Sequence, residues 1–167
     1  MTAVAVNTYT HSVTYVADNI LKSMKDIIRL SGLDPSHLAE CWDVTIRGLR
    51  TWLESQHLER VMLEVFDPRT DALVTKWEIE IVYGWGSREG NFWVDSDALK
   101  YHIRKHGLAP SEAKYRLLLK TKPNAPKVDG WSDVYSRSTA GMVRQSIGTT
   151  IEHHGLGANA AYWRKAS

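Results

Sequence analysis

A single cysteine, Cys41, is the first shortage in this sequence of 167 residues. Cys41 has no partner for a disulfide within the chain, which suits a reducing compartment. Cys41 falls beside Leu38 and Trp42 on the apolar face of a predicted helix. We therefore expect it to be a buried structural thiol, with a reactive thiol as the alternative.

Long apolar runs are missing as well. No stretch approaches the ~20 consecutive apolar residues of a membrane-spanning helix. The N-terminus MTAVAVNTYT lacks the basic start, apolar run and cleavage site of a secretory signal. We expect a cytoplasmic protein without a membrane partner. With 43% hydrophobic and 24% charged residues, the sequence is typical of one globular domain over residues 1–167.

Catalytic motifs are also scarce. The sequence contains no complete dinucleotide loop GxGxxG, no phosphate loop GxxxxGK[ST] and no nucleophile motif GxSxG. His102 and His106 are four residues apart on a predicted helix and could ligate a metal, but no Glu completes HExxH and no third ligand is apparent. We expect His153 and His154 at the surface or in a loop. The sequence therefore predicts no enzyme, no metal site and no cofactor.

The net charge of +2 conceals an uneven distribution. Residues 1–99 hold 9 Lys or Arg against 15 Asp or Glu, whereas residues 100–167 hold 12 against 4. The basic C-terminal part could bind nucleic acid or an acidic partner, and it could equally complement the acidic part of its own fold. Its cations are spaced as on the polar face and edge of a sheet: Lys114, Arg116, Lys120, Lys122 and Lys127.

Helical spacing marks the first third of the chain. Apolar residues recur at this spacing between residues 13 and 28, and Gly32 supplies a stop. Asp34 and Pro35 then signal the start of a second helix. The apolar face of that helix comprises Leu38, Cys41, Trp42, Leu49, Trp52 and Leu53. The short connection predicts that the two helices are neighbours.

The period changes to two after residue 60, which predicts strands. Residues 61–65 and 73–85, joined by a turn at 67–71, form a predicted hairpin with one buried face. Asp95 to Asp97 cap a third helix, and residues 113–122 alternate as a further strand. The expected fold class is α+β, with helices packed on a mainly antiparallel sheet.

Residues 123–167 are rich in glycine and other breakers, yet they retain Trp131, Tyr135, Tyr162 and Trp163. A disordered tail would carry few aromatic side chains, because it has no surface to bury. Val143, Ile147 and Ile151 add apolar contacts. These features favour a long irregular arm that docks on the core in more than one arrangement.

The order of elements resembles a bacterial HORMA-domain protein of the kind found in CBASS-type antiphage signalling operons. The resemblance covers essentially the whole chain and rests on overall pattern, since no short catalytic motif is involved. The segments that carry it are THSVTYVADNILKSMKDIIRLSGLDP, LERVMLEVFDPRTDALVTKWEIEIVYGW, DSDALKYHIRKHG, SEAKYRLLLKT and GMVRQSIGTTIEHHGLGANAAYWRKAS.

The resemblance implies a binding module in which a core, residues 1–122, carries a "safety belt", residues 123–167. The belt closes over a short closure-motif peptide after that peptide pairs with the edge of the sheet. The implied edge consists of Tyr115, Arg116, Leu117, Leu118, Leu119 and Lys120. Trp131 and Tyr135 would pack against the peptide or the underside of the belt. Val143 and Ile147 complete the implied peptide-binding set.

The resemblance also implies partners. The closed form would bind and activate a cGAS-like nucleotidyltransferase, and an AAA+ ATPase would reopen it by engaging the N-terminus at Val4, Val6 and Tyr9. A second HORMA protein is a further candidate partner.

Three other functions stay open at this point. In a nucleic-acid-binding domain, Trp131, Tyr135 and Trp163 would stack on bases. In a structural subunit, tryptophans would anchor an interface. A hydrolase would use His102 and His106.

Overall fold

The computed structural model describes residues 8–84, 92–153 and 155–165. Helices and strands follow one another in a mixed order along the chain: α1 Thr8–Leu30, α2 Ser36–Glu40, α3 Trp42–Glu54, β1 Leu58–Phe66, β2 Leu73–Tyr83, β3 Phe92–Val94, α4 Ser96–His106, β4 Lys114–Thr121, β5 Met142–His153 and β6 Leu156–Lys165.

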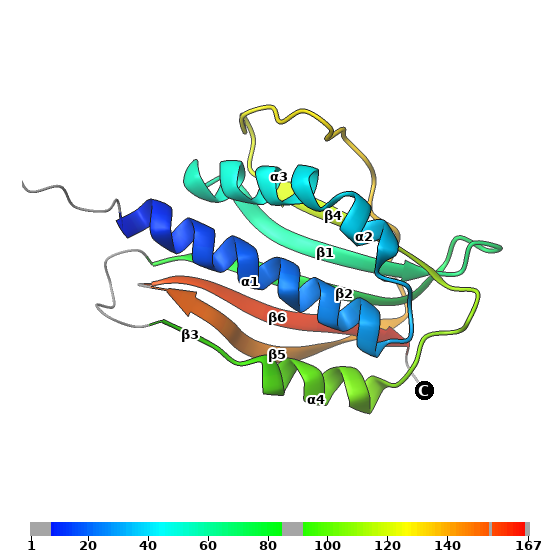
Figure 1. The fold of residues 1–167 in the computed structure, drawn as a ribbon. Helices are drawn as coiled ribbons and strands as arrows, with labels where there is room; N and C mark the ends of the chain where they lie inside the picture. The colour runs from blue at the N-terminus through cyan, green and yellow to red at the C-terminus, as the bar shows by residue number, and fades with distance from the viewer. Residues whose placement is uncertain (1–7, 85–91, 154, 166–167) are drawn as a thin grey trace, which may run out of the picture.

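The strands form one six-stranded sheet in the order β3-β5-β6-β2-β1-β4. Every neighbouring pair is antiparallel. The helices cover one face of this sheet, with α1 lying between α3 and α4 (Figure 1). We call this face the helix face and the opposite one the open face. The α+β class expected from the sequence is confirmed.

The core lies between α1 and the sheet. Between Val13 and Ile28, the aliphatic residues and Met24 of α1 are at most 2% exposed, and they belong to the same core as strand residues such as Leu63 and Trp77. At roughly 1.5–3 kcal/mol for each large apolar side chain, this burial is the main source of stability. The cap predicted for the third helix is also confirmed, because Asp95 accepts a hydrogen bond from the Ala98 N–H at 3.0 Å.

The second predicted helix is two helices. Cys41 ends α2 and also precedes α3, with a backbone (φ −98°, ψ 11°) that departs from the helix. The expectation of a buried Cys41 is therefore wrong, and its thiol is exposed. The prediction assumed one continuous helix through Cys41. Because the helix breaks at this residue, the predicted apolar face does not continue through it, and Cys41 does not point into the core.

The predicted hairpin is confirmed as β1 and β2, in which Leu63 lies opposite Trp77. Trp85, the expected end of its second strand, lies outside the described residues. The expectation of a single buried face is wrong, because Glu64 and Glu78 on the open face are also buried. Arginines from later segments cover both carboxylates, and nothing local in β1 or β2 signals this cover.

The expectation of an irregular arm after residue 123 is also wrong for the part of the chain from residue 142 onward. Residues 142–165 form the strands β5 and β6, and β6 adds to β2 with Tyr162 opposite Trp77. Two register shifts in β5 flank Gly148, which has a φ of 104° and lies opposite Ala160. His153 is a buried residue of β5, 2.5 Å from Ser12 Oγ, and not a surface residue. His154 lies outside the described residues.

Candidate functional site

The strand β4 lies at an edge of the sheet. It pairs with β1 along one side, with Leu117 opposite Leu63 and Leu119 opposite Val61. No other strand among the described residues pairs with its outer side. Alternate residues of β4 therefore direct backbone N–H and C=O groups away from the sheet. Such a row of groups is a template for another extended chain.

The two faces of β4 differ in chemistry. On the helix face, Leu117 and Leu119 are only partly buried, and the Tyr115 hydroxyl donates to the Asp34 carbonyl at 2.6 Å. Burial raises the pKa of Tyr115, so this hydroxyl stays protonated at neutral pH. The open face carries a buried apolar side chain among cations: Lys114, Arg116, Leu118 and Lys120.

Residues 122–141, which we call the crossing segment, connect β4 to β5. The segment first runs along α3 on the helix face. The Trp52 indole N–H donates to the Pro126 carbonyl at 2.7 Å, and the Trp131 indole N–H donates to the Val44 carbonyl at 3.1 Å. The rings of Trp52 and Trp131 meet edge to face, with centroids 5.4 Å apart. This part of the segment is anchored on α3.

Gly48 provides the space for the Trp131 anchor. A Cβ atom at this position would lie 2.6 Å from Trp131 Nε1, closer than real Cβ atoms approach. The indole therefore packs directly against the backbone of α3. A glycine inside a helix usually costs stability, and here it creates the seat for an aromatic ring from a distant segment.

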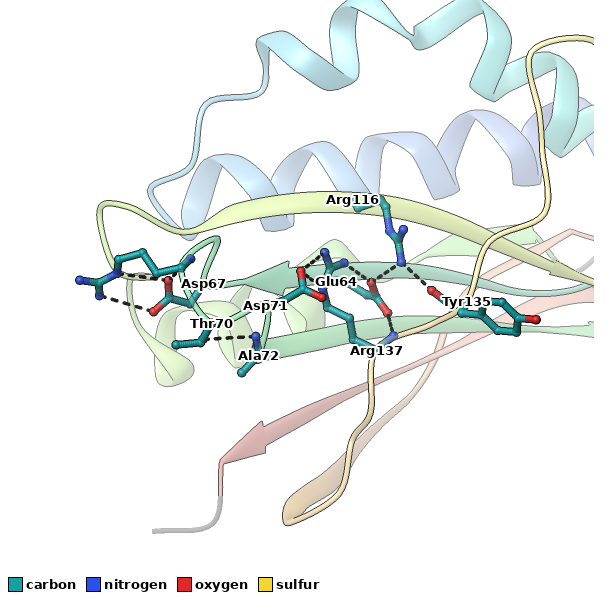
Figure 2. A network of polar contacts seen from close by, with 9 residues as sticks. Glu64, Asp67, Thr70, Asp71, Ala72, Arg116, Tyr135 and Arg137 are labelled. Carbon is teal, nitrogen blue, oxygen red and sulfur yellow. Dashed lines mark hydrogen bonds and ion pairs between the residues drawn. The ribbon is translucent and has the colours of Figure 1, made fainter.

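The same segment is held on the open face by Glu64. This fully buried carboxylate accepts hydrogen bonds from Arg137 Nη1 at 2.8 Å, from the Arg137 backbone N–H at 2.7 Å and from Arg116 Nη2 at 3.0 Å. Figure 2 shows the two guanidinium groups converging on Glu64. Arg137 also bonds Asp71 at 2.7 Å. We call these four residues the Glu64 latch.

The buried carboxylate of the latch is fully paired. A buried carboxylate is tolerated only when it is paired and hydrogen-bonded, and Glu64 has three donors. Burial alone would lower the pKa of Arg137, but its hydrogen bonds and ion pairs with Asp71 and Glu64 outweigh burial and raise that pKa. The guanidinium also stacks 3.6 Å from the centroid of the Phe66 ring.

The crossing segment must pass around the edge of β4 between its two attachments, because Trp131 lies on the helix face and Arg137 on the open face. Residues 132–136 are exposed, with Tyr135 at 95% and Val134 at 55%. Tyr135 is held by its carbonyl, which accepts from Arg116 Nη2 at 2.8 Å. Where the structure describes both partners, no backbone hydrogen bond joins residues 132–136 to β4.

The structure brings together most of the predicted peptide-binding residues. The six residues of β4, with Trp131 and Tyr135, lie along the edge and the segment that rounds it. Val143 and Ile147 do not join them, because they lie on β5 and three strands separate β5 from β4. Of the predicted N-terminal residues, Tyr9 donates its hydroxyl to the Leu53 carbonyl at 2.7 Å, while Val4 and Val6 lie outside the described residues.

Sequence analysis missed Glu64, Asp71, Arg137 and Gly48. Each has an ordinary local context. Glu64 lies on a predicted polar strand face, Asp71 in a turn and Arg137 in a loop. Gly48 is a lone glycine in a helix. Only the path of the crossing segment brings them into contact, and no local pattern encodes that path.

The two histidines considered for a hydrolase or a metal site are engaged in packing. His102 Nδ1 lies 3.4 Å from the Tyr162 hydroxyl, and His106 meets the edge of the Trp77 ring. Burial is the main cause that lowers the pKa of both histidines. Within the described ranges, no group of three or more His, Cys, Asp or Glu residues is placed to hold a metal. No helix in the same ranges is both long and apolar enough to cross a membrane.

Comparison with known proteins places the fold. Solved structures that resemble the chain include one from the mitotic checkpoint complex, with 8% identity, a TM-score of 0.71, and coverage of 93% of this chain and 99% of that one. C. elegans HTP-2 bound to the HIM-3 closure motif has 13% identity and a TM-score of 0.62, and the match covers 99% of this chain and 100% of that one. A chain of the E. coli MS115-1 CdnC:HORMA-deltaN complex has 11% identity and a TM-score of 0.62, and the match covers 100% of this chain and 94% of that one. At these identities the likeness shows the fold alone.

Sequence comparison gives the family. No curated protein sequence matches the chain significantly. The model of the bacterial HORMA domain 2 matches residues 1–166, and no enzyme family is indicated. The resemblance noted from the order of elements is thereby confirmed, and this chain belongs to the bacterial HORMA domain 2 family.

Proposed function

We propose that this protein is a peptide-binding switch, in which an extended closure-motif peptide adds to the free edge of β4 and the crossing segment holds it there. One observation carries the proposal. Among the described residues, no strand pairs with the outer side of β4, and the crossing segment that passes around this side is attached on both faces of the sheet.

Strand addition supplies affinity through the backbone. The peptide would satisfy the outward N–H and C=O groups of β4, and its alternate side chains would lie on the two faces of the sheet. HTP-2, solved in complex with a closure motif, has the same fold, which supports a closure-motif peptide as the ligand.

The crossing segment would make release slow. Once a peptide lies between β4 and residues 132–136, it leaves sideways only if the segment detaches from α3 or from the Glu64 latch. Of the predicted belt, residues 123–167, we therefore assign closure to the irregular part. The strands β5 and β6 fix its far end by pairing with β2, well away from the peptide edge.

The test is capture from a displayed peptide library by the full chain, followed by dissociation kinetics of the enriched peptide. Truncation after residue 122 is unsuitable, because it removes two core strands. Arg137→Ala instead removes the latch from the crossing segment. We expect dissociation at least about tenfold faster, which corresponds to a loss of about 1.4 kcal/mol.

Arg144→Ala is the matched control. Arg144 Nε bonds the buried Glu78 at 3.0 Å on the same open face, but it lies on β5, remote from β4. Equal effects of the two substitutions on dissociation, or no enriched peptide at all, would count against the proposal.

The N-terminal helix offers a route for reopening. Tyr9 ties the start of α1 to the end of α3, and α3 carries the Trp131 anchor. We propose that an AAA+ ATPase pulling on the N-terminus, at Val4, Val6 and Tyr9, draws α1 out of the core and loosens α3. Peptide release in the presence of ATP and ATPase should then be lost when residues 1–7 are deleted.

We further propose that the closed form binds a cGAS-like nucleotidyltransferase in cytoplasmic antiphage signalling, and that a second HORMA protein is a further candidate partner. The E. coli CdnC:HORMA-deltaN complex, which has the same fold, supports this partner class. Co-purification from cells that encode the nucleotidyltransferase and the ATPase tests it. Failure to recover either one would contradict it.

A further inference from the structure

The side chains of β4 point to the chemistry of the peptide, an inference that rests on the proposed strand addition. Lys114, Arg116 and Lys120 project from the same face, because residues two apart in a strand share a face. Lys114 and Lys120 are exposed, and the Arg116 side chain is 35% exposed. These three residues, which we call the edge cations, form a basic row beside the unpaired backbone.

Few carboxylates neutralise this row. Lys114 has no ion pair with any described residue, and Lys120 has one loose contact, 3.7 Å from Glu59, in which both side chains are solvent-exposed. Arg116 belongs to the Glu64 latch, in which two arginines meet two carboxylates, so its charge is balanced there. The net positive charge along the outer side of β4 therefore comes from Lys114 and Lys120.

The helix face of the same strand is apolar. Leu117 and Leu119 pack on the core but remain only partly buried, although β1 residues opposite them, Leu63 and Val61, are fully buried. Another strand beside β4 would cover the part of Leu117 and Leu119 that is left exposed. A strand beside β4 would therefore need apolar side chains on the helix face and acidic side chains on the open face to complement it.

We propose that the β4 edge selects a peptide with alternating character, in which apolar side chains face the helices and Asp or Glu side chains face the edge cations. Neighbouring strands lie about 4.8 Å apart, so opposite side chains make direct pairs. Each pair of opposite charges changes affinity by about 1.4- to 5-fold, and like charges act in the opposite direction. Two or three pairs together distinguish an acidic from a basic peptide.

The crossing segment does not reverse this preference. It contributes Lys122, Lys127 and Arg137 against Asp129 and Asp133, so its formal charge of +1 has the same sign as the edge cations. The same cations could contact the phosphates of a nucleic acid, but an unpaired strand edge beside partly buried leucines suits a peptide better than a phosphate chain. Nucleic-acid binding is one outcome of the test.

The experiment measures fluorescence anisotropy of two labelled peptides with the full chain. One peptide alternates apolar residues with Glu, and the other replaces each Glu by Lys. We expect the Glu peptide to bind about tenfold more tightly. The double variant K114E/K120E should reverse the preference, and Lys114→Glu alone, which disturbs no described ion pair, should weaken it. Thermal melting checks that each variant is folded.

The control is R104E/K105E, which reverses two exposed charges on α4 and should leave the preference unchanged. Equal affinities for the two peptides, binding of neither, or a preference unaffected by K114E/K120E would overturn the inference, as would salt-sensitive binding of single-stranded DNA that K114E/K120E abolishes. These results are distinct from failure of the proposed function. If a library yields a peptide of another composition that protects β4, strand addition stands and only the alternating selectivity is wrong.

Discussion

Glu64 is the residue on which the position of the crossing segment depends most. It is fully buried on a strand whose sequence suggests an exposed polar face, and all its donors come from distant residues. Its burial is stable only while those donors stay in place. The carboxylate therefore couples the fold of the sheet to the closure of the segment.

Replacing Glu64 by Gln should destabilise the protein and release the segment. The change leaves Arg116 and Arg137 without their shared anion, and removal of one partner from a buried ion pair typically costs about 3–5 kcal/mol. Asp71 still holds Arg137, so we expect the lower end of this range. Urea unfolding measures the loss.

Glu80→Gln is the control, because the Glu80 side chain is 46% exposed and, among the described residues, forms an ion pair with Arg60 alone, at 3.4 Å. Equal midpoints for Glu64→Gln and the unmodified protein would show that the latch contributes nothing to stability.

His106 should make stability depend on pH. Burial, followed by the charge of Arg164, lowers its pKa in the folded protein. The unfolded chain therefore takes up the proton first as pH falls. The contribution of His106 is present above about pH 6.5 and is lost as pH falls through the folded-state pKa. Unfolding free energies at about pH 7.5 and pH 5 measure this loss, which should be smaller in His106→Gln.

A His106→Gln variant with an unchanged pH dependence would show that the packing against Trp77 and Tyr162 does not penalise the charged imidazole.

At the scale of elements, α3 supports the crossing segment. Helix propensity at position 48 favours a residue with a side chain, whereas the packing of Trp131 requires glycine there. Gly48→Ala favours the helix by about 1 kcal/mol, yet the added Cβ would lie 2.6 Å from Trp131 Nε1. We expect the helix to persist while the indole is displaced. Hydrogen exchange should become faster in residues 126–137 and stay unchanged in β1.

Arg47→Ala on the exposed side of α3 is the matched control and should leave that exchange unaltered. If Gly48→Ala also leaves it unaltered, Trp131 does not anchor the segment through this seat.

The elements predicted well from sequence are those whose signal is local. The apolar period of α1, the alternation of β1 and β2 and the Asp95 cap depend on residues within one element, and all three are confirmed. The break at Cys41 escaped prediction because apolar residues continue at helical spacing on both sides of it. The strands β5 and β6 escaped because the glycines suggested loops, while two register shifts accommodate irregularity inside a strand.

The candidate site was predicted in part for the same reason. The residues of β4 follow from alternation, and their role follows from the family resemblance. The Glu64 latch joins residues separated by 52 and 73 positions in sequence, so no window along the chain contains it. Placing Val143 and Ile147 at the site was inconsistent with the topology, because strand order is set by long-range pairing.

At the scale of the whole molecule, the β4 edge of the sheet has no partner strand among the described residues, and the rest of the fold supports it from the other side. The β5 and β6 strands extend the sheet on the side of β2, and the helices fill one face. A bound peptide should therefore stabilise the whole domain, by about 2.7 kcal/mol at a concentration of 100 times Kd. Thermal melting with the captured peptide and with a scrambled version tests this expectation.

The most direct test of the central claim is amide hydrogen exchange along β4, measured by NMR with and without the captured peptide. Strand addition predicts that alternate residues between 114 and 121, whose N–H groups face outward, become protected. Residues 92–94 of β3, at the opposite edge, should not change. Protection confined to β3 or to the helices, with β4 exchanging as in the free protein, would contradict the account.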